Sequence, residues 1–267
     1  MRRLTVAPLL AAVLALASSA DGGTSAKAVR IDASASPWTV LASRVVISGR
    51  VTPHPNGVQL TLQQRQGTGW LSVGEKAVGA GGGFSFARAA GKPGVATYRV
   101  ITSKGTGYVG SSASVPVRVL RWEYVTSIEA FAYITPISGN VTTTAITSNG
   151  VRYEHPLALD PGCYNQWGGS AWIDYLLERQ YKQFSATVGL DDASPSGQTA
   201  TFSVIGGDGK KLASGSLVHG AATKIKVSVD GEYRLRLSIN VPDPNNAAGC
   251  STYFPNVVFG DAQLLGP

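Results

Sequence analysis

The sequence has little of what helices are built from. Charged residues make up 15% of the 267 positions, against about 25% in typical domains, and the single methionine is the first residue. Glycine is abundant, with 32 residues, and threonine, serine and valine are frequent. Short strands joined by tight turns have this composition, because β-branched residues favour strands and glycine favours turns. The composition therefore predicts an all-β protein.

Catalytic motifs are also missing. The sequence has no HExxH, GxSxG or phosphate-loop pattern, and its three histidines, at 54, 155 and 219, are far apart and each lies beside a proline or glycine. Without a nucleophile and a base in a recognisable pattern, we expect a protein that is not an enzyme and needs no cofactor. A small secreted hydrolase with unrecognised catalytic residues is the weaker alternative.

The N-terminus has the pattern of a secretory signal peptide. Arg2 and Arg3 precede an apolar run over residues 4–17, and the small residues 18–20 follow. This order of charge, apolar run and small residues predicts cleavage after residue 20 and a secreted, extracellular protein. The run is shorter than the about 20 residues that span a bilayer, and no later run is longer, so we expect no transmembrane segment in the mature chain.

Cysteine is nearly absent, with Cys163 and Cys250 as the only two. They do not form a CxxC motif, which disfavours a zinc or redox site. In an oxidising compartment an even number of cysteines indicates a disulfide, here one that closes a long loop. Such a bridge contributes roughly 4–5 kcal/mol in the chain-entropy model. Two free buried thiols are the alternative.

Positive charge is in modest excess. The formal net charge is +7, and Arg2 and Arg3 account for two of these charges. The rest is scattered along the sequence, with Lys210–Lys211 and the pair at 224 and 226 among the few close groups. This bias suits contact with anionic cell-wall polymers, whereas nucleic acid would need a basic stripe with interleaved aromatics. Charge that only keeps the protein soluble is the simpler interpretation.

Two sets of short strands follow the leader. Residues 21–28 are small and polar, and we expect a disordered lead-in. Over 29–120, about seven short alternating runs with turns between them predict an immunoglobulin-like (Ig-like) β-sandwich. Over 124–267, a second set predicts a jelly-roll β-sandwich. The strands expected in this second set are 128–131, 142–146, 172–177, 181–192, 200–204, 224–229, 233–239 and 257–261, with a tight turn at Asp208-Gly209.

Both halves resemble known families. In the first half, SGRV, VQLTLQQRQGTGW, GGFSFA and YRV resemble the bacterial Ig-like repeats of exported proteins, which implies a spacer. In the second, YKQFSATVGLDD, ATFSVIGGDGKKL and ATKIKVSVDGEYRLRLSIN occur in that order and resemble the NPCBM domain, over roughly 124–264. That family is named as a carbohydrate-binding module found beside glycosidase catalytic domains, so the resemblance implies glycan binding. The CSTYFPNVVFGDAQL end is similar to members with paired cysteines, in agreement with a Cys163–Cys250 bridge.

One departure from the family lies in the expected site. Family members that bind carbohydrate carry a G-x-x-x-H-A segment before the strand that leads to F-x-A-x-V-G. The corresponding stretch here, residues 162–172, has no histidine. The resemblance therefore implies the fold but does not carry the family's sugar specificity to this chain.

Sugar binding needs aromatic faces for the apolar side of a ring and amides for its hydroxyls. Both occur within residues 164–167, and the disulfide would tie this loop to a second polar, aromatic loop at 245–253. The alternative is that Trp167 and Tyr253 cap the core while the amides close turns. The candidate ligand-binding residues are Tyr164, Asn165, Gln166, Trp167, Trp172, Asn246 and Tyr253.

Asp191 and Asp192 are adjacent carboxylates and therefore a candidate catalytic or metal-binding pair. Neighbouring strand residues point to opposite faces, so the two are badly placed to act together on a glycosidic bond. A role as calcium ligands is one interpretation, and ordinary turn hydrogen bonding is the other. The leading function is a secreted, non-catalytic protein that binds cell-wall or environmental polysaccharide. An extracellular structural or protein-interaction module without a sugar site, with a surface protein as partner, is the alternative.

Overall fold

The computed structural model describes residues 27–54, 58–103, 108–134, 140–162, 169–242 and 256–267. Within these ranges the chain is built of β-strands and two 3-10 turns, η1 (Ala80–Gly82) and η2 (Val125–Ser127). The prediction of an all-β sandwich fold is therefore confirmed. None of the helical turns in the described ranges has the length and apolar character needed to cross a membrane.

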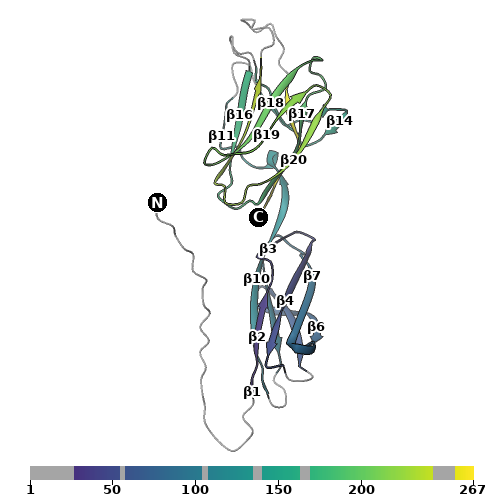
Figure 1. Cartoon of the computed structure of the whole chain (residues 1–267), viewed down its shortest axis with the longest axis vertical. Helices are drawn as coiled ribbons and strands as arrows, with labels where there is room; N and C mark the ends of the chain where they lie inside the picture. The colour runs from purple at the N-terminus through teal and green to yellow at the C-terminus, as the bar shows by residue number, and fades with distance from the viewer. Residues whose placement is uncertain (1–26, 55–57, 104–107, 135–139, 163–168, 243–255) are drawn as a thin grey trace, which may run out of the picture.

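The N-terminal strands form two facing layers (Figure 1). One layer contains β2 (Arg30–Ser34), β4 (Arg44–Thr52) and β7 (Gly83–Ala89). The other contains β3 (Trp38–Val40), β10 (Ser112–Tyr124), β8 (Gly94–Thr102), β5 (Gln59–Gln66) and β6 (Gly69–Ala77). A separate parallel pair joins β1 (Lys27–Ala28) to β9 (Tyr108–Val109), so the last two residues of the expected lead-in are in a strand.

The core of this first sandwich follows directly from period-two alternation. In β5, Leu60 and Leu62 are fully buried, whereas Gln59 is exposed and Thr61 is half-buried. Successive side chains of a strand point to opposite faces, so one face of β5 packs against the opposite layer and the other meets solvent. Ile47, Tyr98 and Val100 contribute to the same cluster from β4 and β8.

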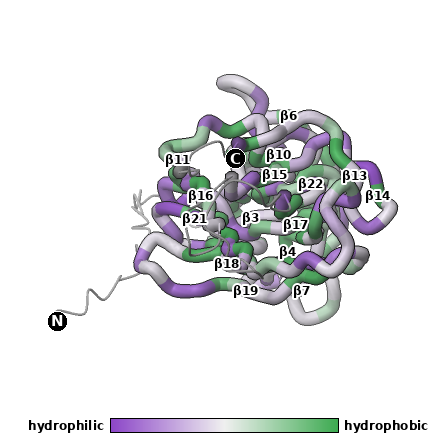
Figure 2. Tube along the Cα trace, turned by 90° about the horizontal axis from the view of Figure 1, so that it is seen from above, coloured by the Kyte–Doolittle hydropathy of each residue, from purple (hydrophilic) through white to green (hydrophobic). Residues whose placement is uncertain are grey.

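The C-terminal strands form a second pair of layers. Five strands, in the order given, make one sheet: β11 (Ala132–Ile134), β16 (Gly169–Leu176), β21 (Arg234–Val241), β18 (Thr199–Gly206) and β19 (Lys211–Val218). The facing layer contains β12 (Val141–Thr142), β15 (Leu157–Leu159), β22 (Val257–Gly266), β17 (Gln183–Leu190) and β20 (Ala222–Ser228). A hairpin of β13 (Ile146–Ser148) and β14 (Val151–Tyr153) packs beside β22. Phe184, Phe202 and Phe259 fill the space between the layers. Figure 2 shows hydrophobic and hydrophilic positions interspersed along the strands.

A single strand joins the two sandwiches. The first part of β10, Ser112–Val119, pairs with β8, and its last part, Arg121–Tyr124, pairs with β22 of the C-terminal sandwich. The chain therefore passes from one sandwich to the other without leaving β conformation, and the two lie end to end in Figure 1. The interval between the two expected domains, residues 121–123, lies inside this strand.

Two of the expected strands are wrong. Residues 128–131 form no strand, although the Phe131 N–H donates to the carbonyl of Asp174 in β16 at 2.8 Å. Ile128 and Ala130, which follow η2, pack against the core. The alternation of apolar and polar residues in this segment therefore reflects packing against the core and not a strand in a sheet. The expected strand 142–146 is divided, since β12 ends at Thr142 and β13 begins at Ile146 in a different sheet. The last strand runs beyond the expected end to Gly266, because it pairs with both β10 and β17.

Candidate functional site

Most of the predicted ligand residues lie outside the described ranges. They are Tyr164, Asn165, Gln166, Trp167, Asn246 and Tyr253, and Cys163 and Cys250 lie outside them as well. The other candidates lie in two segments, 163–168 and 243–255. Trp172 is described, as are the residues that precede and follow each segment, and these neighbours show where both segments join the sheet.

The two segments are bordered by residues that pair with each other. Gly169, which opens β16 after residues 163–168, is opposite Val241, which closes β21 before residues 243–255. Both segments are thus attached to adjacent strands at one end of the five-stranded sheet. Pro161 fixes the approach to β16, because a Cβ on Gly169 would lie 2.5 Å from the Cβ of Pro161. Only glycine fits at this position without moving the proline.

Asp191 supports the other side of the second segment. Its backbone N–H donates to the carbonyl of Asn256 at 3.0 Å, and the Asn256 amide Nδ2 donates to Asp191 Oδ2 at 3.2 Å. Asn256 is the first described residue after 243–255. The buried carboxylate therefore positions the strand entry beside the candidate site.

Asp192 has different partners from Asp191. Its Oδ1 and Oδ2 accept the backbone N–H groups of Asn149 and Gly150 at 2.6 and 2.8 Å, which closes the β13–β14 turn. The other Asp191 oxygen, Oδ1, accepts the N–H of Ala193 at 3.0 Å. All four carboxylate oxygens of the pair are thus engaged, and the two side chains do not converge. Among the described residues no group of three His, Cys, Asp or Glu side chains could hold a metal ion, and calcium at this pair stays a prediction.

Trp172 lies in the middle of β16 on the outward face, where it is half-buried. The guanidinium of Arg236 covers one side of its ring, with Cζ 3.9 Å from the ring centre. Arg236 also donates from Nε and Nη2 to the two oxygens of Asp174, each at 2.8 Å. These hydrogen bonds raise the pKa of Arg236 above its already high value. One ring face is therefore occupied by a cation–π contact, and a ligand would have to use the other.

The outward face beside Trp172 is made of small polar side chains in register. In the row nearest the two segments, strand pairing aligns Ser170, Asn240, Thr201 and Ser216. In the next row it aligns Trp172, Ser238, Ser203 and Ser214. We call the seven polar residues of these two rows, without Trp172, the polar rows. Their hydroxyls and amide both donate and accept hydrogen bonds, as a polyhydroxylated ligand requires.

The sequence alone predicted Trp172 as a site residue but none of the polar rows. The signal was present, because each of these strands alternates polar residues with buried ones, as in Leu237, Ser238, Ile239, Asn240 and Val241. Alternation identifies the outward positions, but the order of strands in the sheet is needed to show that four such positions form one row.

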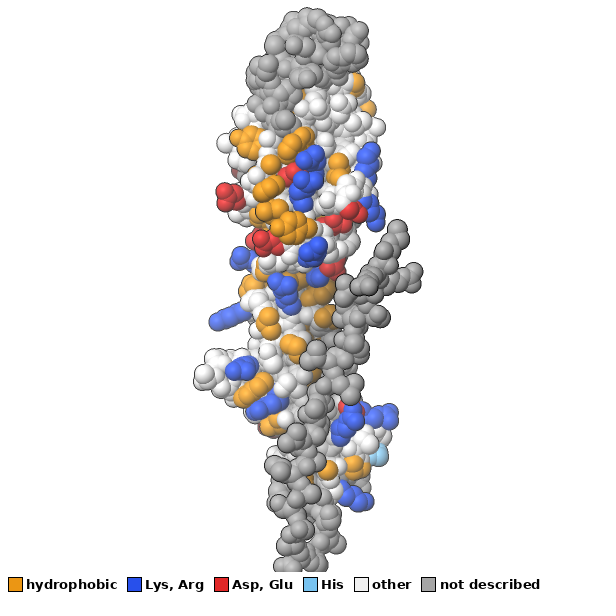
Figure 3. Space-filling view, turned by 90° about the vertical axis from the view of Figure 1, so that its left-hand side faces the viewer, with side chains coloured by type: hydrophobic (Ala, Val, Ile, Leu, Met, Phe, Trp, Pro, Cys, Tyr) orange, Lys and Arg blue, Asp and Glu red, His pale blue; other side chains and the backbone are white. Residues whose placement is uncertain are grey.

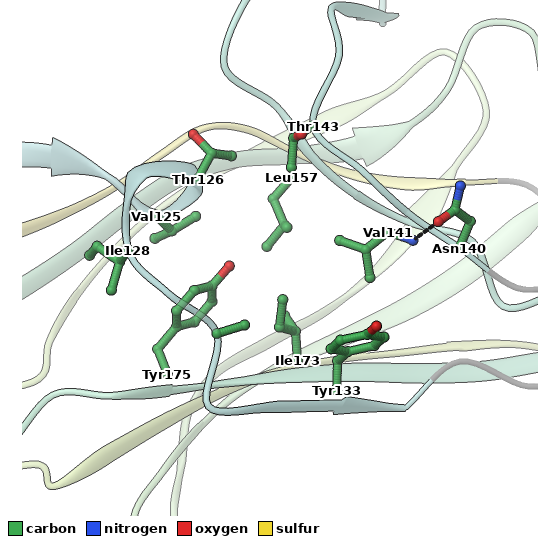
Figure 4. Close-up of a pocket in the computed structure, with 11 residues that line it drawn as sticks. Val125, Thr126, Ile128, Tyr133, Asn140, Val141, Thr143, Leu157, Ile173 and Tyr175 are labelled. Atoms are coloured by element: carbon green, nitrogen blue, oxygen red, sulfur yellow. Dashed lines mark hydrogen bonds between the residues drawn. The ribbon is translucent and has the colours of Figure 1, made fainter.

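The inward face of the same strand borders a cavity of about 430 Å³ between the two layers (Figure 4). Ile173 and Tyr175 line it from β16, opposite Leu157 and Val125. The hydroxyl of Tyr175 points into the cavity (Figure 4), and burial raises the pKa of this side chain above its ordinary value of 10.0. The described lining mixes apolar side chains with uncharged polar ones, among them Thr126, Asn140 and Thr143, and it contains no charged side chain. Such walls suit an uncharged ligand group better than an ion.

The sequence profile of the NPCBM/NEW2 domain matches residues 127–264, just over half of the chain. No curated protein matches the chain. A similar solved structure is CBM51-2 with INT domains of Clostridium perfringens ZmpB in complex with GlcNAc, with 16% identity and a TM-score of 0.42, covering 67% of this chain and 39% of that one. Another is CBM51 from Clostridium perfringens GH95 in complex with methyl-galactose, with 21% identity and a TM-score of 0.39, covering 54% of this chain and 99% of that one. The chain thus spans well under two thirds of the first of these structures.

Proposed function

The chain belongs to the NPCBM/NEW2 domain family, and we propose that its C-terminal sandwich is a carbohydrate-binding module. The observation that carries the proposal is the arrangement of the polar rows beside Trp172. They lie at the end of the sheet where both segments with the candidate aromatic and amide residues are attached. We further propose that the whole protein is a secreted, non-catalytic binder of cell-wall or environmental polysaccharide.

The spacing of the polar rows suits a sugar chain. Side chains two residues apart on a strand are separated by about 6.6 Å, and neighbouring strands lie about 4.8 Å apart. Hydroxyls on one or two adjacent sugar rings are spread over similar distances, so several can be bound at once. The face of Trp172 that Arg236 does not cover would supply an apolar contact for the sugar ring.

The charges on this face favour binding over hydrolysis. A glycosidase needs two carboxyl groups free to exchange protons with the substrate or to attack it. Asp174 is the carboxylate of this face among the described residues, and it is 1% exposed and held by Arg236 and Arg234. A carboxylate whose two oxygens are both held by arginines is not free to reach a substrate, which supports a non-catalytic role.

Glycan-array screening of the full chain, followed by calorimetry on any retained polysaccharide, tests the proposal. We expect Trp172→Ala and Asn240→Ala to weaken binding by roughly tenfold or more each, since the first removes the aromatic face and the second removes the amide of the proposed site. Tyr233→Ala is the matched control, because Tyr233 is another exposed aromatic, 51% exposed, away from the polar rows. Retention of no glycan by the wild type would favour the alternative of a structural or protein-interaction module.

Export and the disulfide are tested separately. We propose that residues 1–20 are removed and that Cys163 and Cys250 form a bridge, which would hold the two candidate segments together. Intact mass and N-terminal sequencing of protein recovered from the medium would show both. A free-thiol signal from the secreted protein, or an uncleaved leader, would contradict the corresponding part of the proposal.

A further inference from the structure

The excess positive charge is confined to one of the two sandwiches. Residues 29–120 contain ten Lys and Arg residues but only two acidic ones, Asp32 and Glu75. Residues 124–267 contain nine Lys and Arg residues and twelve Asp and Glu residues. The lower part of Figure 3, which holds the N-terminal sandwich, accordingly shows many Lys and Arg side chains and very few acidic ones. A net charge of this size on one domain concentrates the electrostatic field there.

Three of these cations surround one cavity. The cavity has a volume of about 640 Å³ and is lined by Arg65 from the end of β5, Arg88 from the end of β7, and Lys92 from the loop that leads to β8. The amides of Gln64 and Gln66 add neutral donors to the same wall. No acidic side chain is among its described lining residues. We call this the cationic cavity.

None of the three cations has a carboxylate partner within 4.0 Å among the residues that the structure describes. Asp32 is paired with Arg30. In the C-terminal sandwich, by contrast, Arg234, Arg236 and Lys182 each lie against an aspartate. Like charges around one cavity repel each other and lower the stability of the folded state. A bound anion would offset this repulsion.

We propose that the N-terminal sandwich binds an anionic polysaccharide, with its carboxylate or phosphate groups in the cationic cavity. Arginine presents a planar fork that pairs with such groups through two parallel hydrogen bonds, and lysine adds a compact charge. The glutamine amides suit the hydroxyls of the same sugar units. This site is independent of the polar rows, which lie on the other sandwich and carry the proposed function.

The described lining argues against other polyanions. Single-stranded nucleic acid is held by aromatic side chains on which bases stack, and the described lining of the cationic cavity contains none. A membrane surface would need apolar side chains that enter the lipid beside the basic ones. Here the exposed apolar lining residues are Ala89, Pro93 and Val95, none of which is long or aromatic, and Val95 is 72% exposed.

The test measures binding of the full chain to polygalacturonate, with neutral dextran and a single-stranded DNA homopolymer as comparison probes, at low and moderate salt. The first variant combines Arg65→Gln, Arg88→Gln and Lys92→Gln. The matched control combines Lys210→Gln, Lys211→Gln and Lys224→Gln, three exposed lysines of the C-terminal sandwich without described ion pairs. Both variants lower the net charge by three, so any difference between them reports position and not total charge.

We expect the wild type to bind polygalacturonate with an affinity that falls as salt rises, and not to bind dextran through this site. The cavity variant should lose roughly tenfold or more of that affinity, while the control loses less than about threefold. Thermal unfolding should show the cavity variant at least as stable as the wild type, because repulsion is relieved. Equal losses in the two variants, no polygalacturonate binding, or DNA binding that is stronger and lost in the same variant would each overturn the proposal. Loss of glycan binding in Trp172→Ala without loss of polygalacturonate binding would separate this site from the proposed function.

Discussion

The Cζ atom of Arg236 lies 3.9 Å from the centre of the Trp172 ring. The same guanidinium holds both oxygens of Asp174, and Arg234 approaches that carboxylate at 3.4 Å. Asp174 is buried although it belongs to the outward face of its strand, because these longer side chains cover it. The cluster links β16 to β21 and sets the orientation of the aromatic ring that borders the polar rows.

Asp174→Asn should destabilise the protein by about 3 kcal/mol, since it leaves two arginines beside a buried neutral group. Chemical denaturation with urea measures the change. The control is Glu154→Gln, which breaks an ion pair of the same 2.8 Å length with Arg152. Both of those side chains are 65% exposed, so their loss should cost less than about 1 kcal/mol. Equal costs for the two substitutions would show that burial does not strengthen the Asp174 cluster.

Gly169→Ala should destabilise the entry to β16. A Cβ at this position would lie 2.5 Å from the Pro161 Cβ and 3.0 Å from its Cγ, so the proline has to move. Overpacking of this kind costs about 1–3 kcal/mol. Gly83→Ala is the control, because a Cβ there meets nothing within 4 Å and φ is −73°. A thermal unfolding midpoint that is unchanged in Gly169→Ala would contradict the predicted close contact.

Tyr175 should make the protein sensitive to alkaline pH. Burial raises its pKa above 10.0 in the folded state, whereas the unfolded chain ionises near that value. The unfolded state therefore loses protons first, and the free energy of unfolding falls as pH rises above about 10. In Tyr175→Phe this contribution disappears, so the decline between pH 9 and 11 should be less steep than in the wild type. Tyr133→Phe, at a tyrosine 64% exposed on the cavity rim, should leave the decline unchanged.

Asp192→Ala should cost about 2 kcal/mol, because it removes the acceptors of two backbone N–H groups in the β13–β14 turn. Asp208→Ala, which removes an acceptor of a single N–H, from Lys210, should cost about half as much or less. The same proteins test the calcium prediction. With all four oxygens of Asp191 and Asp192 already hydrogen-bonded, we expect no change in Tm between calcium and a chelator. A rise in Tm with calcium that is lost in Asp192→Ala would instead assign the pair as calcium ligands.

Much of the fold could be predicted from local alternation. Leu60 and Leu62, or Leu235, Leu237 and Ile239, are buried on one face of their strands as period two requires. The predictions fail where a segment is buried but does not form a strand. Ile128 and Ala130 have the same spacing as strand residues, but they pack against the core outside any strand.

The site was less predictable, for a topological reason. Ser170, Asn240 and Thr201 come from three strands far apart in sequence, and only the sheet order places them in one row. Asp174 and Arg236 are 62 residues apart, so their pairing also has no local signal. The cationic cavity is similar, because Arg65 is far in sequence from Arg88 and Lys92, and spacing along the chain does not show that the three line one cavity. The count of charges per domain shows only that this sandwich carries an excess of cations.

The continuity of β10 has a mechanical consequence. If the C-terminal sandwich holds one polymer and the N-terminal sandwich another, tension between them passes along this 13-residue strand. The hydrogen bonds of β10 to β8 and β22 run across the direction of pull, so they are loaded in shear and must yield together. A flexible linker would stretch under the same load. The central strand, about 44 Å long, would instead act as a stiff connection. The protein would then resist extension most strongly along the line that joins its two ligands.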